Sequence, residues 1–308
     1  MTNESHQDDD TYWPEPRLSP ALARDWFRDR IAAREPASLV RLGNSEFSML
    51  GYGSIASWSQ TSQALKGWFG RDDFEPHLLE HLAEQLRRAV RHATVVGLPR
   101  PSRQRSDEYC KRVRHVFTEH ALYTTRQIFT DCGIHRFWQM LLAYRELLSD
   151  LPFLGIVGCR DVAARVSATF HIAEVDVFPI PAAPAAPGAF EHLGPHFPDH
   201  FNRVCRELEV PYRGAVFIIG AGGLGKIYAN LIHERGGIAI DIGSALDGWA
   251  MQPTRGFLRQ DPDLFSLEPY GQSEGWEPKL LMERYRRLIG RVYYGARPTD
   301  EEIAFYQE

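Results

Sequence analysis

The stretch AVFIIGAGGLGKIYANLIHERGGIAIDIG, residues 215–243, contains the strongest indication of the fold. An apolar run leads into the pattern Gly220-x-Gly222-x-x-Gly225, a helical segment follows, and a second apolar run ends at Asp241. Strand, glycine-rich turn, helix, strand and terminal acid at this spacing are typical of a dinucleotide-binding unit. The stretch therefore predicts a βαβ unit and raises the question of which ligand its glycines serve.

The glycine-rich turn has the chemistry of an anion site. Gly222 and Gly223 allow backbone N–H groups to approach a ligand, and the helix that follows directs its N-terminal dipole to the same place. Lys226 lies in the first turn of that helix and could add a positive charge. A phosphate-bearing ligand is favoured, and the alternative is that the glycines only allow close packing of helix and strand.

Apolar runs alternate with amphipathic segments along the rest of the chain. We expect strands at 38–43, 93–99, 153–159, 175–180, 215–220 and 237–243, and helices at 20–34, 74–92, 107–122, 134–149, 199–209 and 223–236. The strands are apolar on both faces, which is typical of strands covered on both sides. The predicted fold is α/β, with a mostly parallel, Rossmann-like sheet between two layers of helices. The glycine-punctuated stretch 44–54 is expected to be a turn.

The predicted organisation is a disordered N-terminal tail followed by a single domain. Residues 1–17 are polar and contain prolines, and residues 18–308 form the domain. Its part after about residue 250 is expected to be irregular, with a last helix near 277–290. The proline-rich loop 179–198 is long enough to be functional, and we expect it to act as a lid on the acceptor side.

The composition excludes several classes of protein. A formal net charge of −5 gives no nucleic-acid footprint. The acidic start MTNESHQDDD is unlike a secretory leader, and no apolar run reaches the length of a membrane helix. The four cysteines lack CxxC spacing, so we expect reduced thiols in a cytoplasmic protein.

A second polar cluster, RLGNSE at 41–46, follows the first predicted strand. The carboxyl end of a parallel strand is where such sheets bind ligands. Arg41 can fork onto a phosphate, and Glu46 can bind Mg²⁺ or Mn²⁺ or act as a base. The alternative is a simple ion pair of Arg41 and Glu46 beside a turn.

RLGNSE resembles the R-x-G-D-G-E motif of the GT-D fold glycosyltransferases, which act in bacterial polysaccharide and glycoprotein assembly. The C-terminal block, with GGIAIDIG and Asp247 behind it, is similar to theirs as well. Weaker similarities lie between the two, and they are TTRQIF at 124–129, LPFLGIVGCR ending at Arg160, and PGAF at 187–190. The resemblance spans roughly residues 36–250 in the family's order.

The resemblance implies a hexosyltransferase-type enzyme that moves a sugar from a nucleotide donor, typically UDP-linked, to a glycan, glycoprotein or lipid-linked acceptor. It also implies Mn²⁺ or Mg²⁺, held by the acidic motif whose two positions fall on Asn44 and Glu46. Asn44 offers a neutral carbonyl where the family has Asp, so metal affinity should fall. The family's His after D-I-G is also replaced, here by Ser244-Ala245.

The motifs together predict the site. We expect Glu46 to be its central carboxylate and Asp241 to bind ribose or act as a base. The expected nucleotide-sugar-binding residues are Arg41, Gly43, Asn44, Arg160, Gly222, Gly223, Lys226 and Asp247. A cytoplasmic protein that associates peripherally with the inner membrane is compatible with this function.

Two other functions remain open at this point. An NAD(P)-dependent oxidoreductase would use Gly220-x-Gly222-x-x-Gly225, although that fingerprint normally opens the first βαβ unit and here belongs to the last. A noncatalytic protein that binds nucleotide sugars would account for Asn44 and Ser244. The glycosyltransferase interpretation explains both motifs and their order, whereas the oxidoreductase interpretation explains only one of them.

Overall fold

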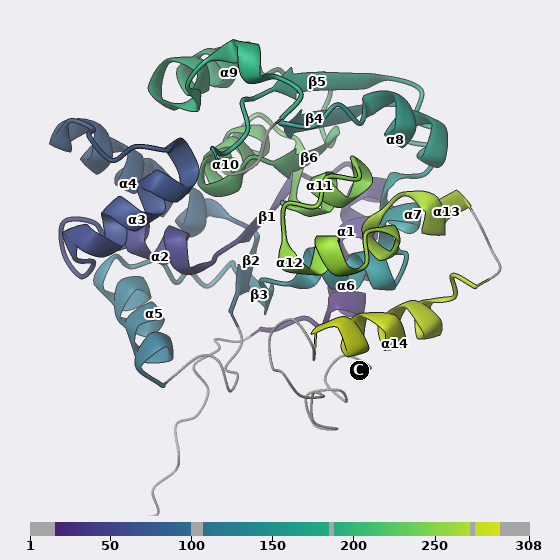
Figure 1. The fold of residues 1–308 in the computed structure, drawn as a ribbon, viewed down its shortest axis with the longest axis horizontal. Helices are drawn as coiled ribbons and strands as arrows, with labels where there is room; N and C mark the ends of the chain where they lie inside the picture. Colours follow the sequence, from purple (N-terminus) through teal and green to yellow (C-terminus); the bar gives the residue numbers. More distant parts are fainter. Residues whose placement is uncertain (1–15, 100–106, 185–187, 272–274, 290–308) are drawn as a thin grey trace, which may run out of the picture.

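The described residues of the computed structural model, 16–99, 107–184, 188–271 and 275–289, form one parallel sheet between layers of helices (Figure 1). Its strand order is β3-β2-β1-β7-β6-β4-β5, and every pairing is parallel. The strands are β1 (Ala37–Arg41), β2 (Val95–Leu98), β3 (Ile128–Asp131), β4 (Leu154–Gly158), β5 (Val175–Pro179), β6 (Val216–Gly220) and β7 (Ile238–Asp241). The predicted parallel α/β fold is confirmed.

The helices fall into two layers because successive strand residues face opposite sides of the sheet. Val40 belongs to one core and its neighbour Leu39 to the other. The first core is completed by α2 (Asn44–Leu50), α3 (Trp58–Phe69), α4 (Pro76–His92), α5 (Asp107–Glu119), α9 (Phe201–Glu207) and α10 (Gly225–Glu234). The second is completed by α1 (Pro20–Ala33), α6 (Ile134–Met140), α7 (Ala143–Leu148), α8 (Ala163–Phe170) and α11 (Ala245–Trp249).

Three local predictions were wrong. The expected turn at 44–54 begins with α2, because the Glu46 carboxylate accepts the N–H of Gly43 at 2.9 Å and caps the helix start. The expected helix at 134–149 divides into α6 and α7 at Leu142, which has a φ of 53°. The short strand β3 was missed, since its four residues follow a polar stretch and carry little pattern.

The chain after residue 250 contains three further helices, which are α12 (Gly256–Gln260), α13 (Glu268–Gly271) and α14 (Pro278–Ile289). The first and the last of them pack on a third, smaller core, whereas Tyr270 of α13 belongs to the second core. In the third core, Phe265 and Tyr285 pack with Phe137, so this core is attached to the main domain through α6. Most of the tail predicted to be disordered, residues 1–15, lies outside the described residues.

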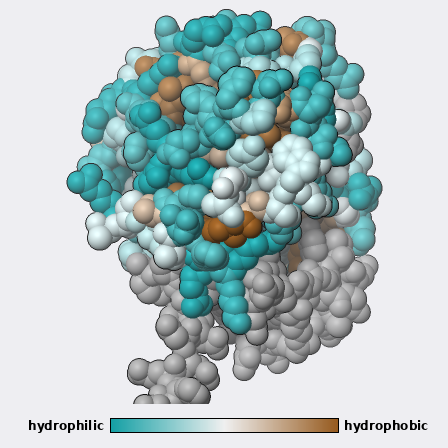
Figure 2. Space-filling view, turned by 90° about the vertical axis from the view of Figure 1, so that its left-hand side faces the viewer, coloured by the Kyte–Doolittle hydropathy of each residue, from teal (hydrophilic) through white to brown (hydrophobic). Residues whose placement is uncertain are grey.

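The outer surface on the side of α3 and α4 is mainly hydrophilic, with small and scattered apolar areas (Figure 2). In keeping with this, none of the described helices is both long and apolar enough to cross a bilayer.

Candidate active site

The two motifs meet because β7 lies between β1 and β6. Leu39 of β1 pairs with Ile240 of β7, and Ile219 of β6 pairs with Asp241. The carboxyl ends of all three strands therefore reach the same edge of the sheet, which is where doubly wound α/β sheets bind ligands. RLGNSE and the glycine-rich turn form one site although they lie at opposite ends of the fold's sequence.

Arg41 and Asp241 form the centre of this site. Arg41 Nη2 donates to Asp241 Oδ1 at 3.0 Å, and Arg41 Nε donates to the Asp241 carbonyl at 2.8 Å. Gly243, at a φ of 48°, leaves the space that the guanidinium fills, and a Cβ at that position would overlap Arg41 Nη2. The glycine of the IDIG stretch is thus required by Arg41.

Lys226 points into the site from the first turn of α10. Its Nζ lies 3.0 Å from Asp241 Oδ2, 3.1 Å from Glu46 Oε1 and 3.0 Å from the Gly222 carbonyl oxygen. Burial opposes the charged form, but the carboxylates of Asp241 and Glu46 outweigh it and raise the pKa of Lys226. Lys226 was expected to face a phosphate, and in the structure its ammonium instead joins the two carboxylates.

Of the remaining residues of the RLGNSE motif, Glu46 contacts Lys226, whereas Asn44 lies at the surface. Glu46 uses Oε2 to cap Gly43 and Oε1 to bind Lys226. Its side chain is 12% exposed, as is that of Arg41, whereas the Asp241 side chain is only 3% exposed. Asn44, the first residue of α2, is exposed. The part of the network that a ligand can reach is therefore Glu46 and Arg41. We call Arg41, Glu46, Lys226 and Asp241 the ion network.

The two central glycines of the turn have different surroundings. Gly222 is exposed at a φ of 56°, and a Cβ there would meet no atom within 4 Å. Gly223 is buried, and a Cβ there would overlap the indole ring of Trp68 from α3. Gly222 is thus open to a ligand, while Gly223 makes room for Trp68.

Arg160 and Asp247 form a second ion pair on the same edge. Arg160 Nε lies 2.6 Å from Asp247 Oδ1, and Thr254 Oγ1 donates to Asp247 Oδ2 at 2.6 Å. Arg160 follows β4 and Asp247 lies on α11, whose Leu246 covers Gly220 at the end of β6. The structure thus brings this pair together next to the glycine-rich turn.

The sequence interpretation missed His135, which lies at the start of α6 behind Arg41. Its Nδ1 is 2.6 Å from Arg41 Nη1, and its Nε2 is 3.5 Å from Ser244 Oγ. Burial and the charge of Arg41 hold the pKa of His135 well below its ordinary value. Because arginine only donates, the neutral ring accepts at Nδ1 and carries its proton on Nε2, toward Ser244. The signal was the position of His135 shortly after β3, a strand that was itself missed.

The expected metal site does not fit these residues. Both oxygens of Glu46 and both oxygens of Asp241 already accept from N–H groups of the protein. No group of three or more His, Cys, Asp or Glu side chains suited to a metal occurs among the described residues. Asn44 offers at most one neutral oxygen beside them.

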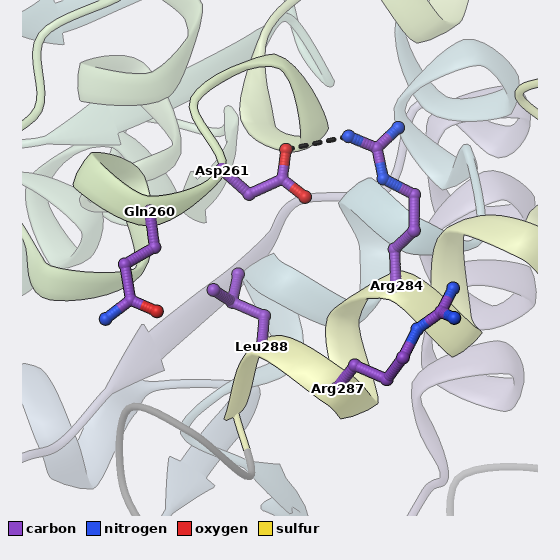
Figure 3. Close-up of a pocket in the computed structure, with 5 residues that line it drawn as sticks. All are labelled: Gln260, Asp261, Arg284, Arg287 and Leu288. Atoms are coloured by element: carbon purple, nitrogen blue, oxygen red, sulfur yellow. Dashed lines mark hydrogen bonds and ion pairs between the residues drawn. The ribbon is translucent and has the colours of Figure 1, made fainter.

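A surface hollow near α12 and α14 is separate from the ion network (Figure 3). It is lined by Gln260, Asp261, Arg284, Arg287 and Leu288. Across it, Arg284 Nη2 donates to Asp261 Oδ1 at 2.7 Å. The hollow includes no residue of either predicted motif.

The fold and the site define an α/β protein with a polar cluster at the carboxyl edge of three neighbouring strands. Residues 20–152 match the family model of the GT-D fold-like domain. This part contains Arg41, Glu46 and His135. The match confirms the predicted GT-D relationship for this part of the chain, and it supports a glycosyltransferase.

Comparison with other proteins gives the following similarities. A structure described as a new glycosyltransferase from Streptococcus sanguinis is 15% identical, with 75% of this chain and 81% of that chain covered and a TM-score of 0.46. A selenomethionine-substituted domain of unknown function 1792 is 14% identical, with 74% and 77% covered and a TM-score of 0.44. None of the curated proteins matches the chain.

Proposed function

We propose that the protein transfers a sugar from a UDP-linked donor to a glycan, glycoprotein or lipid-linked acceptor. The observation that carries this proposal is the meeting of Arg41 and Glu46 with Lys226 and Asp241 at the edge formed by β1, β7 and β6. The family match over residues 20–152 supports glycosyl transfer, and the donor and acceptor are part of the proposal.

The leaving nucleoside diphosphate develops negative charge, which must be met by cations or N–H groups fixed in place. The open turn at Gly222, which leads into α10, supplies backbone N–H groups, and the partly exposed Arg41 supplies a cation. We assign Glu46, the reachable carboxylate, to the reacting sugar or acceptor. Asp241 is almost fully buried, so we assign it to positioning Arg41 and Lys226 rather than to contact with ribose.

The geometry disfavours a dinucleotide. In a dinucleotide domain the acid after the second strand is free to bind the ribose hydroxyls. Here both oxygens of Asp241 are occupied by Arg41 and Lys226. The glycine-rich turn is therefore better suited to a diphosphate next to Arg41 than to NAD(P).

A thermal-shift series tests the donor class. We expect UDP and UDP-sugars to raise the unfolding midpoint and NAD(H) and NADP(H) to leave it unchanged, since only a ligand that binds the folded state stabilises it. Stabilisation by NAD(H) alone would overturn the proposal.

A hydrolysis assay of UDP-sugars then tests catalysis. Glu46→Ala should abolish slow donor hydrolysis, while Glu207→Ala, at a 63% exposed side chain on α9, serves as the matched control. If UDP-sugars bind but Glu46→Ala leaves hydrolysis untouched, Glu46 is not the catalytic carboxylate. If the wild type binds UDP-sugars without turnover of donor or of any acceptor, the protein is a noncatalytic nucleotide-sugar binder.

A further inference from the structure

Lys226 bridges the two carboxylates of the site. Its Nζ is 3.1 Å from Glu46 Oε1 and 3.0 Å from Asp241 Oδ2. The other oxygen of Glu46 accepts from the Gly43 N–H, and the other oxygen of Asp241 accepts from Arg41. A cation thus already lies between the carboxylates to which a metal would bind.

The ammonium is held on every side. Its third partner is the Gly222 carbonyl oxygen at 3.0 Å, so each of its three N–H groups has an acceptor. The Lys226 side chain is only 5% exposed, and the pKa of Lys226 is raised by Asp241 and Glu46. Lys226 is therefore a fixed, charged member of the site.

A divalent ion cannot share this position. Mg²⁺ binds oxygen at about 2.1 Å, closer than the carboxylate oxygens are to the ammonium nitrogen. The ion network contains two cations and two carboxylates, so its charges already balance. An added ion would place two further positive charges beside the buried ammonium, where repulsion is weakly screened.

We propose that Lys226 takes the place of the divalent cation and that the donor diphosphate binds without Mg²⁺ or Mn²⁺. This inference rests on the proposed use of a nucleotide-sugar donor. The charge of the diphosphate is met instead by Arg41 and by the backbone N–H groups of the open turn at Gly222. Position 44 then needs no carboxylate, because no metal binds there, and the exposed Asn44 is compatible with activity.

The first experiment measures metal and nucleotide binding to the wild-type protein. In a Mn²⁺ titration followed by electron paramagnetic resonance, the signal of free Mn²⁺ should stay undiminished by the protein. By calorimetry, the Kd for UDP in EDTA should agree with that in Mn²⁺ to within about twofold. Stoichiometric Mn²⁺ binding, or a loss of UDP affinity in EDTA of more than about tenfold, overturns the proposal.

Two variants test whether Lys226 or Asn44 is the reason that the protein is expected not to bind Mn²⁺. Asn44→Asp restores an acid on an exposed position and should still leave the Mn²⁺ signal undiminished. Asn44→Asp combined with Lys226→Met removes the ammonium and should bind Mn²⁺. If Asn44→Asp alone binds Mn²⁺ as tightly as the double variant, Lys226 does not exclude the metal and the proposal is overturned. Should circular dichroism find the double variant unfolded, the Asn44→Asp result decides alone.

These readouts also distinguish this inference from the proposed function. If neither UDP nor UDP-sugars bind with or without Mn²⁺, the donor assignment fails. The Mn²⁺ titrations of the wild type and of Asn44→Asp need no nucleotide, so they still test whether Lys226 excludes the metal.

Discussion

Arg41 and Asp241 are 200 residues apart in the chain, and the guanidinium of one binds both the carboxylate and the main-chain carbonyl of the other. The two residues end neighbouring strands, so this pair joins the end of β1 to the end of β7. Burial raises the pKa of Asp241, but Arg41 and Lys226 outweigh it and the pKa lies below its ordinary value. The carboxylate is therefore charged in the folded protein and fixes both cations.

Replacing Asp241 should destabilise the fold strongly. Asp241→Asn leaves Arg41 and Lys226 with one negative charge fewer in a buried position, and losing one partner of a buried pair costs about 3–5 kcal/mol. Urea denaturation measures this change in the free energy of unfolding. Asp73→Asn, at a 74% exposed side chain, should change it by less than about 0.5 kcal/mol. A loss below about 1 kcal/mol for Asp241→Asn would show that the ion network adds little stability.

The contact between Gly223 and Trp68 predicts the effect of one added methyl group. Gly223→Ala places a Cβ inside the Trp68 ring, so α3 or the turn must move, at a cost of about 1–3 kcal/mol. Gly271→Ala is the control, because a Cβ there meets nothing within 4 Å. Thermal unfolding of both variants provides the comparison. Equal midpoints for the two would mean that Trp68 does not cover the turn in solution.

His196 predicts a loss of stability in acid. Burial lowers the pKa of His196 to about 3, and its Nε2 lies 2.9 Å from the hydroxyl oxygen of Tyr228. A folded-state pKa below the unfolded value of about 6.5 gives stability that is fully present above pH 6.5 and is lost as the pH falls toward 3. Between pH 6.5 and pH 4.5 this titration should lower the free energy of unfolding by about 2 kcal/mol.

The variant His196→Gln removes this titration and keeps a side chain that can bind Tyr228. Its free energy of unfolding should fall less steeply than that of the wild type between pH 6.5 and 4.5. Urea denaturation at several pH values measures both slopes. Identical slopes would contradict the assignment of acid sensitivity to His196.

Thr254 and Arg160 should both stabilise the fold through Asp247, which contacts each of them. Thr254→Val removes one hydrogen bond and should cost about 1 kcal/mol of unfolding free energy. Asp247→Ala removes that bond and also leaves Arg160, whose side chain is 4% exposed, without this partner, so its cost should be larger. Because both variants remove the same bond, the double variant should lose no more than Asp247→Ala alone. Strictly additive losses in urea denaturation would contradict the shared role of Asp247.

The fold was predictable from sequence wherever a strand was long and apolar. AVFIIG, SLVRLG and GIAIDIG became β6, β1 and β7, and the polar residues at or shortly after their ends identified Arg41, Lys226 and Asp241 as residues of one edge. The strand order was not predictable, because nothing local in GIAIDIG states that β7 lies between β1 and β6. For the same reason the ion pairs were not predictable: Arg41 pairs with Asp241, and Glu46 pairs with Lys226 rather than with Arg41.

His135 was missed for a different reason. Its role depends on β3 and on a helix start whose sequence, DCGIHRFW, has neither a long apolar run nor a capping side chain. Similarly, α2 was missed because its N-cap residue, Gly43, has no capping side chain, and the N–H of Gly43 is instead accepted by the carboxylate of Glu46, three residues later in the sequence. The role of a residue that depends on contacts with distant parts of the chain is difficult to predict from the local sequence pattern.

Among the strands that the structure describes, the last to be synthesised, β7, is the one that unites the sheet. Without β7, the order β3-β2-β1-β7-β6-β4-β5 falls into two separate three-stranded sheets, and Arg41 and Lys226 each lack the carboxylate of Asp241. Since a chain leaves the ribosome from its N-terminus, a nascent protein that ends before residue 238 has both halves of the site but no junction between them. The edge that carries the ion network is therefore complete only once β7 lies between β1 and β6.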